Sequence, residues 1–114
     1  HMRSSELPIY RVTYELFHEV TRLARNFPRD LKIALSGKLQ SECTDLVLAV
    51  YRANCSRGEQ RRKYIASILE RVQVVELLLR LCKDMKLLSI KQHSRCVELT
   101  DQIGRQANGW KNAT

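Results

Sequence analysis

Two short groupings of side chains in this 114-residue chain could in principle carry catalytic or metal chemistry. His18-Glu19 places an imidazole beside a carboxylate, and His93-x-x-Cys96 places two metal-binding types one helical turn apart. A zinc deaminase would add a Pro-Cys-x-x-Cys segment, and a closed zinc site would need two more ligands. The sequence also lacks a glycine-rich phosphate loop and a Gly-x-Ser-x-Gly elbow. It therefore predicts a non-enzyme without metal or cofactor, in which both histidines are core or boundary residues.

A third grouping, Arg61-Arg62-Lys63, could bind phosphates. It falls in the first turn of a predicted helix, where the helix dipole disfavours each cation by a few tenths of a kcal/mol. Residues that oppose a local rule are candidates for function, although a solvated run of charge is an equal alternative. The whole chain has 20 Lys and Arg against 12 Asp and Glu, a net charge of +8, which favours a polyanion such as RNA or DNA as partner.

The hydrophobic pattern predicts the elements that position these side chains. Apolar residues recur at spacings of three and four, which is typical of amphipathic helices, over residues 9–27, 30–54, 60–86 and 89–111. Short connections make consecutive helices neighbours that run in opposite directions. We therefore predict an all-α fold, an antiparallel up-down-up-down four-helix bundle formed by one domain over residues 1–114.

Local signals define the helix ends. Pro28 is expected to end the first helix, and Asp30 is expected to be the N-cap of the second. Ser89 and Gln92 match a capping box at the start of the fourth helix. Gly37 lies inside the second helix, where it predicts a close approach of another backbone.

Antiparallel packing gathers the cations at the two ends of the bundle. Those near helix C-termini also have a simpler cause, because they complement the helix dipole. With only seven aromatic residues, mostly on the helical stripes, we expect phosphate contacts with weak sequence selectivity and strong salt dependence. The candidate nucleic-acid-binding residues are Arg57, Arg61, Arg62 and Lys63 at one end, and Arg22, Arg25, Arg29, Lys32, Lys86, Lys91 and Arg95 at the other.

The second and third predicted helices carry more apolar residues than one core stripe uses. A wide stripe on the two most buried helices would explain the excess, but we favour an interface between copies of the chain. The candidate interface residues are Val47, Leu48, Tyr51, Leu69, Val74, Leu77, Leu78 and Leu81.

The remaining sequence features concern the cellular compartment. The cysteines at positions 43, 55, 82 and 96 include no Cys-x-x-Cys pair, and no secretion signal is evident, so free thiols are expected. No apolar run is long enough to span a membrane. We expect a cytoplasmic protein in which residues 1–7 are a flexible tail that begins with a tag-derived His1-Met2.

The stretch LRLCKDMKLLSIKQ at residues 79–92, followed by Ile103-Gly104-Arg105 and Gly109-Trp110, is similar to a known family. It resembles the accessory variability determinant proteins of diversity-generating retroelements. These proteins lie within a broader family of four-helix bundles encoded in intervening sequences of bacterial 23S rRNA genes. Leu7-Pro8-Ile9-Tyr10, Asn26-Phe27-Pro28-Arg29 and Leu35-Ser36-Gly37 add to the resemblance, which covers nearly the whole chain.

The resemblance implies a homopentameric ring with a positively charged surface that binds RNA or DNA. For the retroelement branch it also implies a reverse transcriptase as partner, with the protein as a non-catalytic accessory to complementary-DNA synthesis. The alternative is a protein–protein interaction module of the intervening-sequence branch with no direct nucleic-acid role. Asn108 and His93 stand where the family often has Gly and Tyr, so both branches stay open.

Overall fold

The computed structural model describes residue 3 and residues 6–114. The expected tag-derived residues 1 and 2, and residues 4 and 5 of the expected tail, lie outside the described residues. Within the described residues the chain is all-helical, without a strand, as the sequence predicts. The long helices are α1 (Pro8–Ala24), α3 (Gly37–Asn54), α4 (Gly58–Asp84) and α5 (Ile90–Ala113).

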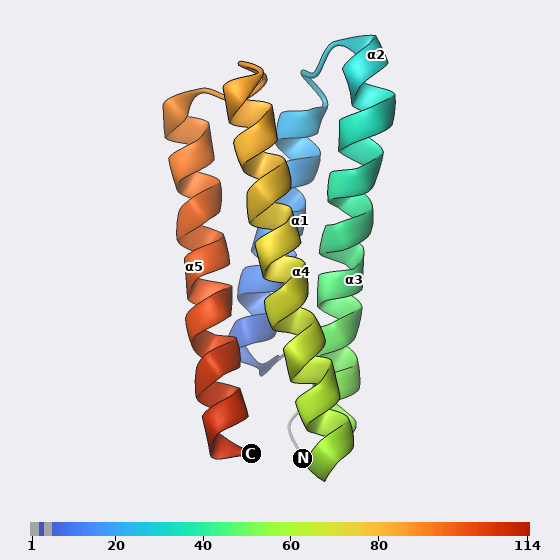
Figure 1. Ribbon diagram of the computed structural model, residues 1–114, viewed down its shortest axis with the longest axis vertical. Helices are drawn as coiled ribbons and strands as arrows, with labels where there is room; N and C mark the ends of the chain where they lie inside the picture. The colour runs from blue at the N-terminus through green and yellow to red at the C-terminus, as the bar shows by residue number, and fades with distance from the viewer. Residues whose placement is uncertain (1–2, 4–5) are drawn as a thin grey trace.

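The four long helices form an elongated bundle of 43 × 22 × 21 Å. In Figure 1 the chain ascends along α1, descends along α3, ascends along α4 and descends along α5. α1 and α4 each pack against both α3 and α5, so α1 and α4 occupy opposite corners. We call the end that holds the α1–α3 and α4–α5 connections the upper end, as Figure 1 draws it, and the opposite end the lower end.

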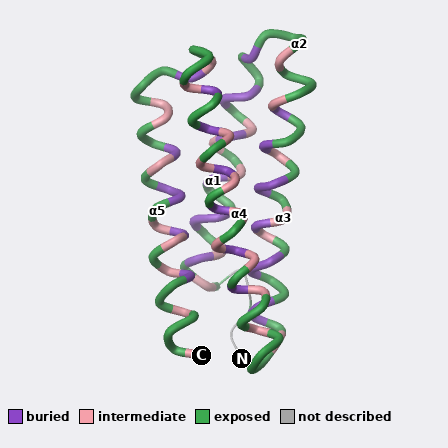
Figure 2. The backbone as a smooth tube through the Cα atoms, in the orientation of Figure 1, coloured by how far each residue is buried: buried purple, intermediate pink, exposed green. Residues whose placement is uncertain are grey.

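A single seam from each long helix builds the core (Figure 2). The seam of α4 is fully apolar and buried, and each large side chain there contributes about 1.5–3 kcal/mol relative to exposure. Its residues follow the apolar spacing of three and four that predicts this helix: Ile65, Ile68, Val72, Val75, Leu79 and Cys82. The seam of α5 includes Leu99, which is buried, while His93 and Trp110 are only half-buried.

The α1–α3 connection differs from the prediction at both of its ends. α1 ends at Ala24 rather than Phe27, because the amides of Asn26 and Phe27 donate to carbonyls three residues back and tighten the turn before Pro28. The prediction of Asp30 as N-cap was wrong. Pro28 occupies the cap position, and no side chain caps the short helix α2 (Arg29–Leu31).

α2 continues into α3 through a π-helical turn, Lys32–Ser36, so residues 29–54 are one irregular helical run. The expected close approach at Gly37 is not observed. This glycine is exposed, and no described atom outside its own helix backbone would lie within 4 Å of a methyl group placed on it. The irregularity of this run comes from the widened turn before Gly37 rather than from packing against it.

The α4–α5 connection is held by two capping motifs. Lys86 has φ 62°, the amide of Leu87 donates to the Cys82 carbonyl, and the amide of Lys86 donates to the Lys83 carbonyl. These bonds form a Schellman motif and end α4 two residues before the predicted end. The predicted capping box at Ser89 and Gln92 is present, with bonds of 2.9 and 3.0 Å.

No described helix is both long enough and apolar enough to cross a membrane.

Candidate nucleic-acid interface

The eleven candidate cations divide into two groups once their contacts are known. Some are held by carboxylates or carbonyls of the bundle, and the rest have no hydrogen-bond or ion-pair partner for their side chains within the described part of the chain. A side chain held in the fold must break those contacts before it binds a phosphate. The free cations are Arg25, Arg29, Lys86 and Lys91 at the upper end and Arg57 and Lys63 at the lower end.

Arg61 is the most engaged cation of the lower end. Its Nε donates to the Ala53 carbonyl at 2.9 Å, and its Nη2 donates to the Asn54 carbonyl at 3.2 Å. Its guanidinium also lies 5.6 Å from the centre of the Trp110 ring. Arg61 thereby satisfies the last carbonyls of α3 and ties α3 and α4 to α5.

The other two residues of the basic run, Arg62 and Lys63, differ from each other in their contacts. Arg62 bonds Glu59 at 2.9 Å and the carbonyl of Thr114 at 2.8 Å, whereas Lys63 is exposed and free. The expected position of this basic run in the first turn was wrong for Arg62 and Lys63, because α4 begins at Gly58 and only Arg61 falls at the end of the first turn. Contacts within the fold explain two of the three residues. Lys63 and the exposed Arg57 remain available at the lower end.

At the upper end, three of the candidate cations are also held. Arg22 pairs with Glu19 on its own helix, and Arg95 of α5 pairs with Glu15 of α1, which joins these two helices. The Nζ of Lys32 donates to the Arg25 carbonyl at 3.1 Å and so satisfies the C-terminal end of α1.

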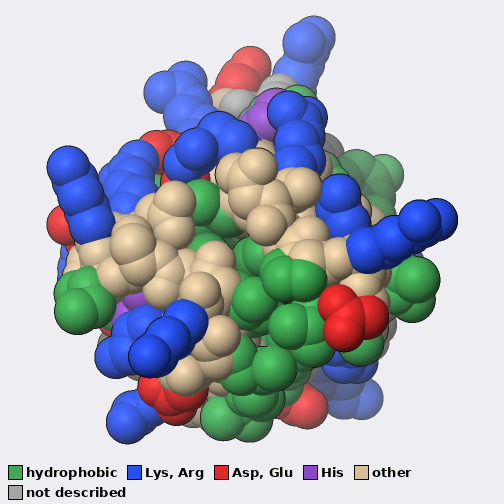
Figure 3. Space-filling model, turned by 90° about the horizontal axis from the view of Figure 1, so that it is seen from above, with side chains coloured by type: hydrophobic (Ala, Val, Ile, Leu, Met, Phe, Trp, Pro, Cys, Tyr) green, Lys and Arg blue, Asp and Glu red, His purple; other side chains and the backbone are tan. Residues whose placement is uncertain are grey.

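The four free cations of the upper end come from both connections of that end. Arg25 and Arg29 flank the α1–α3 turn, and Lys86 and Lys91 flank the α4–α5 turn; all four are exposed. Seen from above, Lys and Arg side chains surround the upper end and project from its rim (Figure 3). This surface can contact several phosphates at once without first breaking an ion pair.

Below the ends, acidic side chains neutralise much of the basic charge. Glu42 is buried, and its two carboxylate oxygens accept from Lys38 at 3.1 Å and from Arg71 at 2.9 Å. Burial by itself raises the pKa of Glu42, but the hydrogen bonds from Arg71 and Lys38 outweigh it and hold the pKa below its ordinary value. This network fastens α3 to α4 and is structural.

The side chains of the histidine and cysteine fragments are engaged in packing and ion pairing. Glu19 is engaged by Arg22, and His18 packs edge-on against Tyr14 with ring centres 4.6 Å apart. Burial raises the pKa of Cys96 to about 11 and that of Cys43 to about 12. Across the described residues, no three His, Cys, Asp or Glu side chains are placed to hold a metal ion. His18 is exposed, so the prediction of a core or boundary position was wrong for it, whereas His93 does lie at the boundary.

The candidate interface residues do not form one patch. Val47 and Leu48 line a hollow between α3 and α1, and Tyr51 is exposed one turn further along α3. Leu69 lies on the side of α4 that faces α5, because Glu76, two turns later, accepts from Thr100 of α5 at 3.0 Å. The other four, Val74, Leu77, Leu78 and Leu81, lie on the outer side of α4.

The outer side of α4 carries an apolar ridge of five residues. Leu77, Leu81 and Met85 are 64%, 42% and 44% exposed. Leu78 lies two turns after Arg71, which bonds Glu42 of α3, so this ridge faces outward beside α3. The sequence prediction missed Met85, although its spacing from Leu78 and Leu81 continues the pattern. We call Val74, Leu77, Leu78, Leu81 and Met85 the α4 ridge.

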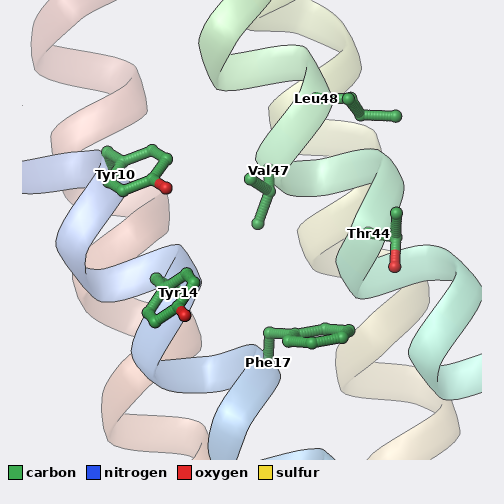
Figure 4. Close-up of a pocket in the computed structure, with 6 residues that line it drawn as sticks. All are labelled: Tyr10, Tyr14, Phe17, Thr44, Val47 and Leu48. Carbon is green, nitrogen blue, oxygen red and sulfur yellow. The ribbon is translucent and has the colours of Figure 1, made fainter. Parts of the chain in front are cut away.

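Between α1 and α3 lies a hollow of about 160 Å³ (Figure 4). We call its lining the α1–α3 groove: Tyr10, Tyr14, Phe17, Thr44, Val47 and Leu48. Tyr10 and Tyr14 stack with ring centres 6.0 Å apart, and Tyr14 is 48% exposed. The sequence prediction missed these aromatic side chains, although their spacing of three and four residues on one face of α1 could have indicated them.

Residues 8–114 match the model of a family described as bAvd-like. This match covers nearly all of the chain and includes every candidate cation and interface residue. No curated protein and no solved structure matches the chain.

Proposed function

Since the chain belongs to the bAvd-like family, we propose that it is a non-catalytic accessory protein that binds RNA or DNA. In this proposal it acts in the cytoplasm as a homo-oligomer of antiparallel four-helix bundles, with five copies as the expected number. Its partner is the reverse transcriptase of a retroelement, and its role is to hold nucleic acid for that enzyme.

One observation carries the nucleic-acid part of the proposal: four exposed cations of the upper end have no ion pair among the described residues. Exposed cations without a carboxylate partner release counterions when they meet phosphates, and this release is the main source of non-specific affinity. The shape of the upper end favours several simultaneous contacts, because the cations come from two separate connections.

Lys86 adds a second argument. A side chain in the left-handed region costs roughly 1 kcal/mol compared with glycine, which most Schellman motifs use at this position. The chain therefore has a lysine where glycine would give a more stable turn. A phosphate contact by the Lys86 side chain would explain this preference.

The test is a fluorescence anisotropy titration of labelled single-stranded RNA and DNA at several salt concentrations. The variant Arg29→Gln/Lys86→Gln/Lys91→Gln removes three of the four free upper-end charges and keeps Arg25. We expect a 10-fold or greater loss of affinity, with the slope of log K against log salt reduced by about 2–3.

A matched control removes three cations elsewhere on the bundle: Arg52→Gln/Arg105→Gln/Lys111→Gln. These residues are exposed and lie outside the candidate set, so a purely global charge effect would weaken binding equally in both variants. Equal losses, or binding that does not depend on salt, would exclude the upper end as the phosphate-binding surface.

The second candidate function is a protein–protein interaction module without a nucleic-acid role. The exposed α4 ridge and α1–α3 groove favour it, because unpartnered apolar surfaces of this kind usually mark interfaces. A protein–protein interaction module predicts no binding of RNA or DNA at physiological salt. A purified partner protein would instead bind the chain in a fluorescence anisotropy titration.

A further inference from the structure

The chain exposes two apolar surfaces, a row of side chains on α4 and a hollow between α1 and α3. The α4 ridge consists of aliphatic side chains on the outside of the bundle, with Leu77 as its most exposed member at 64%. The α1–α3 groove is concave and lined with aromatic rings around a hollow of about 160 Å³. A row of leucine side chains at a spacing of three and four residues is the usual occupant of such a groove.

The two surfaces lie on neighbouring sides of the bundle. The groove is on the side formed by α1 and α3, and the ridge projects from α4 on the side formed by α3 and α4. Neighbouring sides of a four-helix bundle meet at about 90°. A contact from ridge to groove between copies is therefore head-to-tail. A turn of about 90° at each copy would close a ring of four, and the five copies of the proposed function require a turn of about 72°.

Charges beside each surface are complementary in sign and in spacing. Arg11 and Arg25 lie on the same face of α1 as Tyr14, whereas Glu70 and Asp84 lie two turns before and two turns after Leu77. Both pairs are separated by 14 residues, about 21 Å along a helix. All four side chains are exposed, and none forms an ion pair within residues 3 and 6–114.

The directions of α1 and α4 allow both pairs of opposite charges to meet between neighbouring copies. α1 and α4 both ascend toward the upper end (Figure 1), so copies related by an axis along the bundle present α1 and α4 side by side in the same direction. Arg11 then faces Glu70 of the next copy, and Arg25 faces its Asp84.

We infer that the α4 ridge of one copy packs into the α1–α3 groove of the next, with Arg11–Glu70 and Arg25–Asp84 ion pairs at its border. This inference rests on the self-association in the proposed function and adds which two surfaces meet. It also pairs Arg25 within the assembly, which leaves Arg29, Lys86 and Lys91 as the free upper-end cations for phosphate.

The first test is a charge reversal followed by light scattering. Arg11→Glu/Arg25→Glu and Glu70→Lys/Asp84→Lys should each lower the mass of the assembly toward the 13.3 kDa of one chain. Combining all four changes restores the attraction and should return the assembly to its original mass.

The second test mixes two blocked chains. Leu77→Glu/Leu81→Glu removes the ridge but keeps the groove, and Tyr14→Glu/Leu48→Glu removes the groove but keeps the ridge. Each variant alone should be a monomer, and an equimolar mixture should form a dimer of twice the mass of one chain, because only one intact interface remains.

The outcomes separate this inference from the proposed function. A monomeric parent chain would remove the proposed self-association and this inference together. A parent oligomer whose mass survives the charge reversals and both blocks would overturn only the pairing of ridge with groove. A groove-blocked variant that still dimerises by itself would show a two-fold contact between ridges instead. Circular dichroism of every variant establishes that the exposed substitutions leave the helices folded.

Discussion

At the scale of single residues, contacts decide which charges are available to a ligand. Arg61 and Lys63 are two positions apart in one basic run, yet Arg61 is held by two carbonyls and an aromatic ring while Lys63 is free. The first stabilises the bundle, and the second can meet a phosphate.

Arg61→Ala should therefore reduce stability rather than binding. We expect the free energy of unfolding to fall by about 1–3 kcal/mol, because the Ala53 and Asn54 carbonyls lose the hydrogen bonds from the guanidinium and Trp110 loses its cation contact. Arg61→Lys should recover only part of this loss, since an ammonium lacks the planar fork. Urea unfolding followed by circular dichroism measures both.

Lys63→Ala is the matched control for Arg61. It should change the free energy of unfolding by less than about 0.5 kcal/mol and weaken nucleic-acid binding modestly. The reverse result, a stable Arg61→Ala with lost RNA affinity, would assign Arg61 to phosphate contact instead.

Glu42 provides a prediction about pH. Its pKa is lowered in the folded state by hydrogen bonds from Arg71 and Lys38, which outweigh its burial. The carboxylate therefore contributes stability above its unfolded-state pKa, and this contribution is lost as the pH falls through the folded-state pKa. Glu42→Gln should cost about 1.5–3 kcal/mol at pH 7, and its deficit relative to the parent should shrink at pH 3.

Unfolding in urea at both pH values tests this prediction. Asp101→Asn is the control, because Asp101 is exposed and has no partner among the described side chains. A Glu42→Gln deficit that is equal at pH 7 and pH 3 would mean that lost packing, and not the charge, causes the effect.

At the scale of the elements, the helix connections hold the structural features that periodicity did not predict. Residues 29–54 enter α3 through a π-helical turn, and α4 ends at a lysine in the left-handed region. Both features lie at the upper end and position its free cations. The long helices supply the rigid frame, and their connections supply the candidate interface.

Two glycines test the backbone requirements of these elements. Gly37 has helical φ and ψ of −60° and −44°, and a methyl group there meets no described neighbour. Gly37→Ala should raise the free energy of unfolding by about 0.4–1 kcal/mol by restricting the unfolded chain. Gly58 has φ 56°, so Gly58→Ala should destabilise by about 1 kcal/mol or more.

Thermal unfolding of Gly37→Ala and Gly58→Ala tests whether the backbone conformation of each glycine, rather than the packing of the added methyl group, determines the change in stability. If Gly37→Ala lowered the melting temperature as much as Gly58→Ala, the π-helical turn before Gly37 would depend on the flexibility of glycine.

At the scale of the whole molecule, the total charge of an assembly is the net charge of one chain, +8, multiplied by the number of copies. Five copies in one ring would present five upper ends to one polyanion. Several weak phosphate contacts then combine into one strong attachment, provided that the nucleic acid is long enough to reach more than one copy.

This multivalency predicts a dependence on RNA length. The monomeric variant Leu77→Glu/Leu81→Glu should bind an RNA of about 60 nucleotides at least 100-fold more weakly than the parent assembly. Both proteins should bind an RNA of about 8 nucleotides with similar affinity, because it reaches only one copy. Anisotropy titrations with the two RNAs give the comparison, and an equal loss on both would show that the substitutions damage the phosphate surface itself.

The amino-acid sequence by itself determined the helical class and the core seam of α4. Apolar spacing of three and four residues places one face of a helix against its neighbours whatever the partner, so the α4 seam could be predicted residue by residue. The capping box at Ser89 and Gln92 is equally local, since its two hydrogen bonds lie within one turn.

Only the tertiary structure decided which polar and apolar surface residues are free. Arg61 is engaged by carbonyls seven and eight residues away and by a ring 49 positions along the chain, and Arg95 pairs with Glu15 across 80 positions. The ridge and the groove likewise depend on how α1, α3 and α4 pack. Periodicity reports the direction of a side chain around its own helix, whereas the identity of its neighbour is a property of the packed bundle.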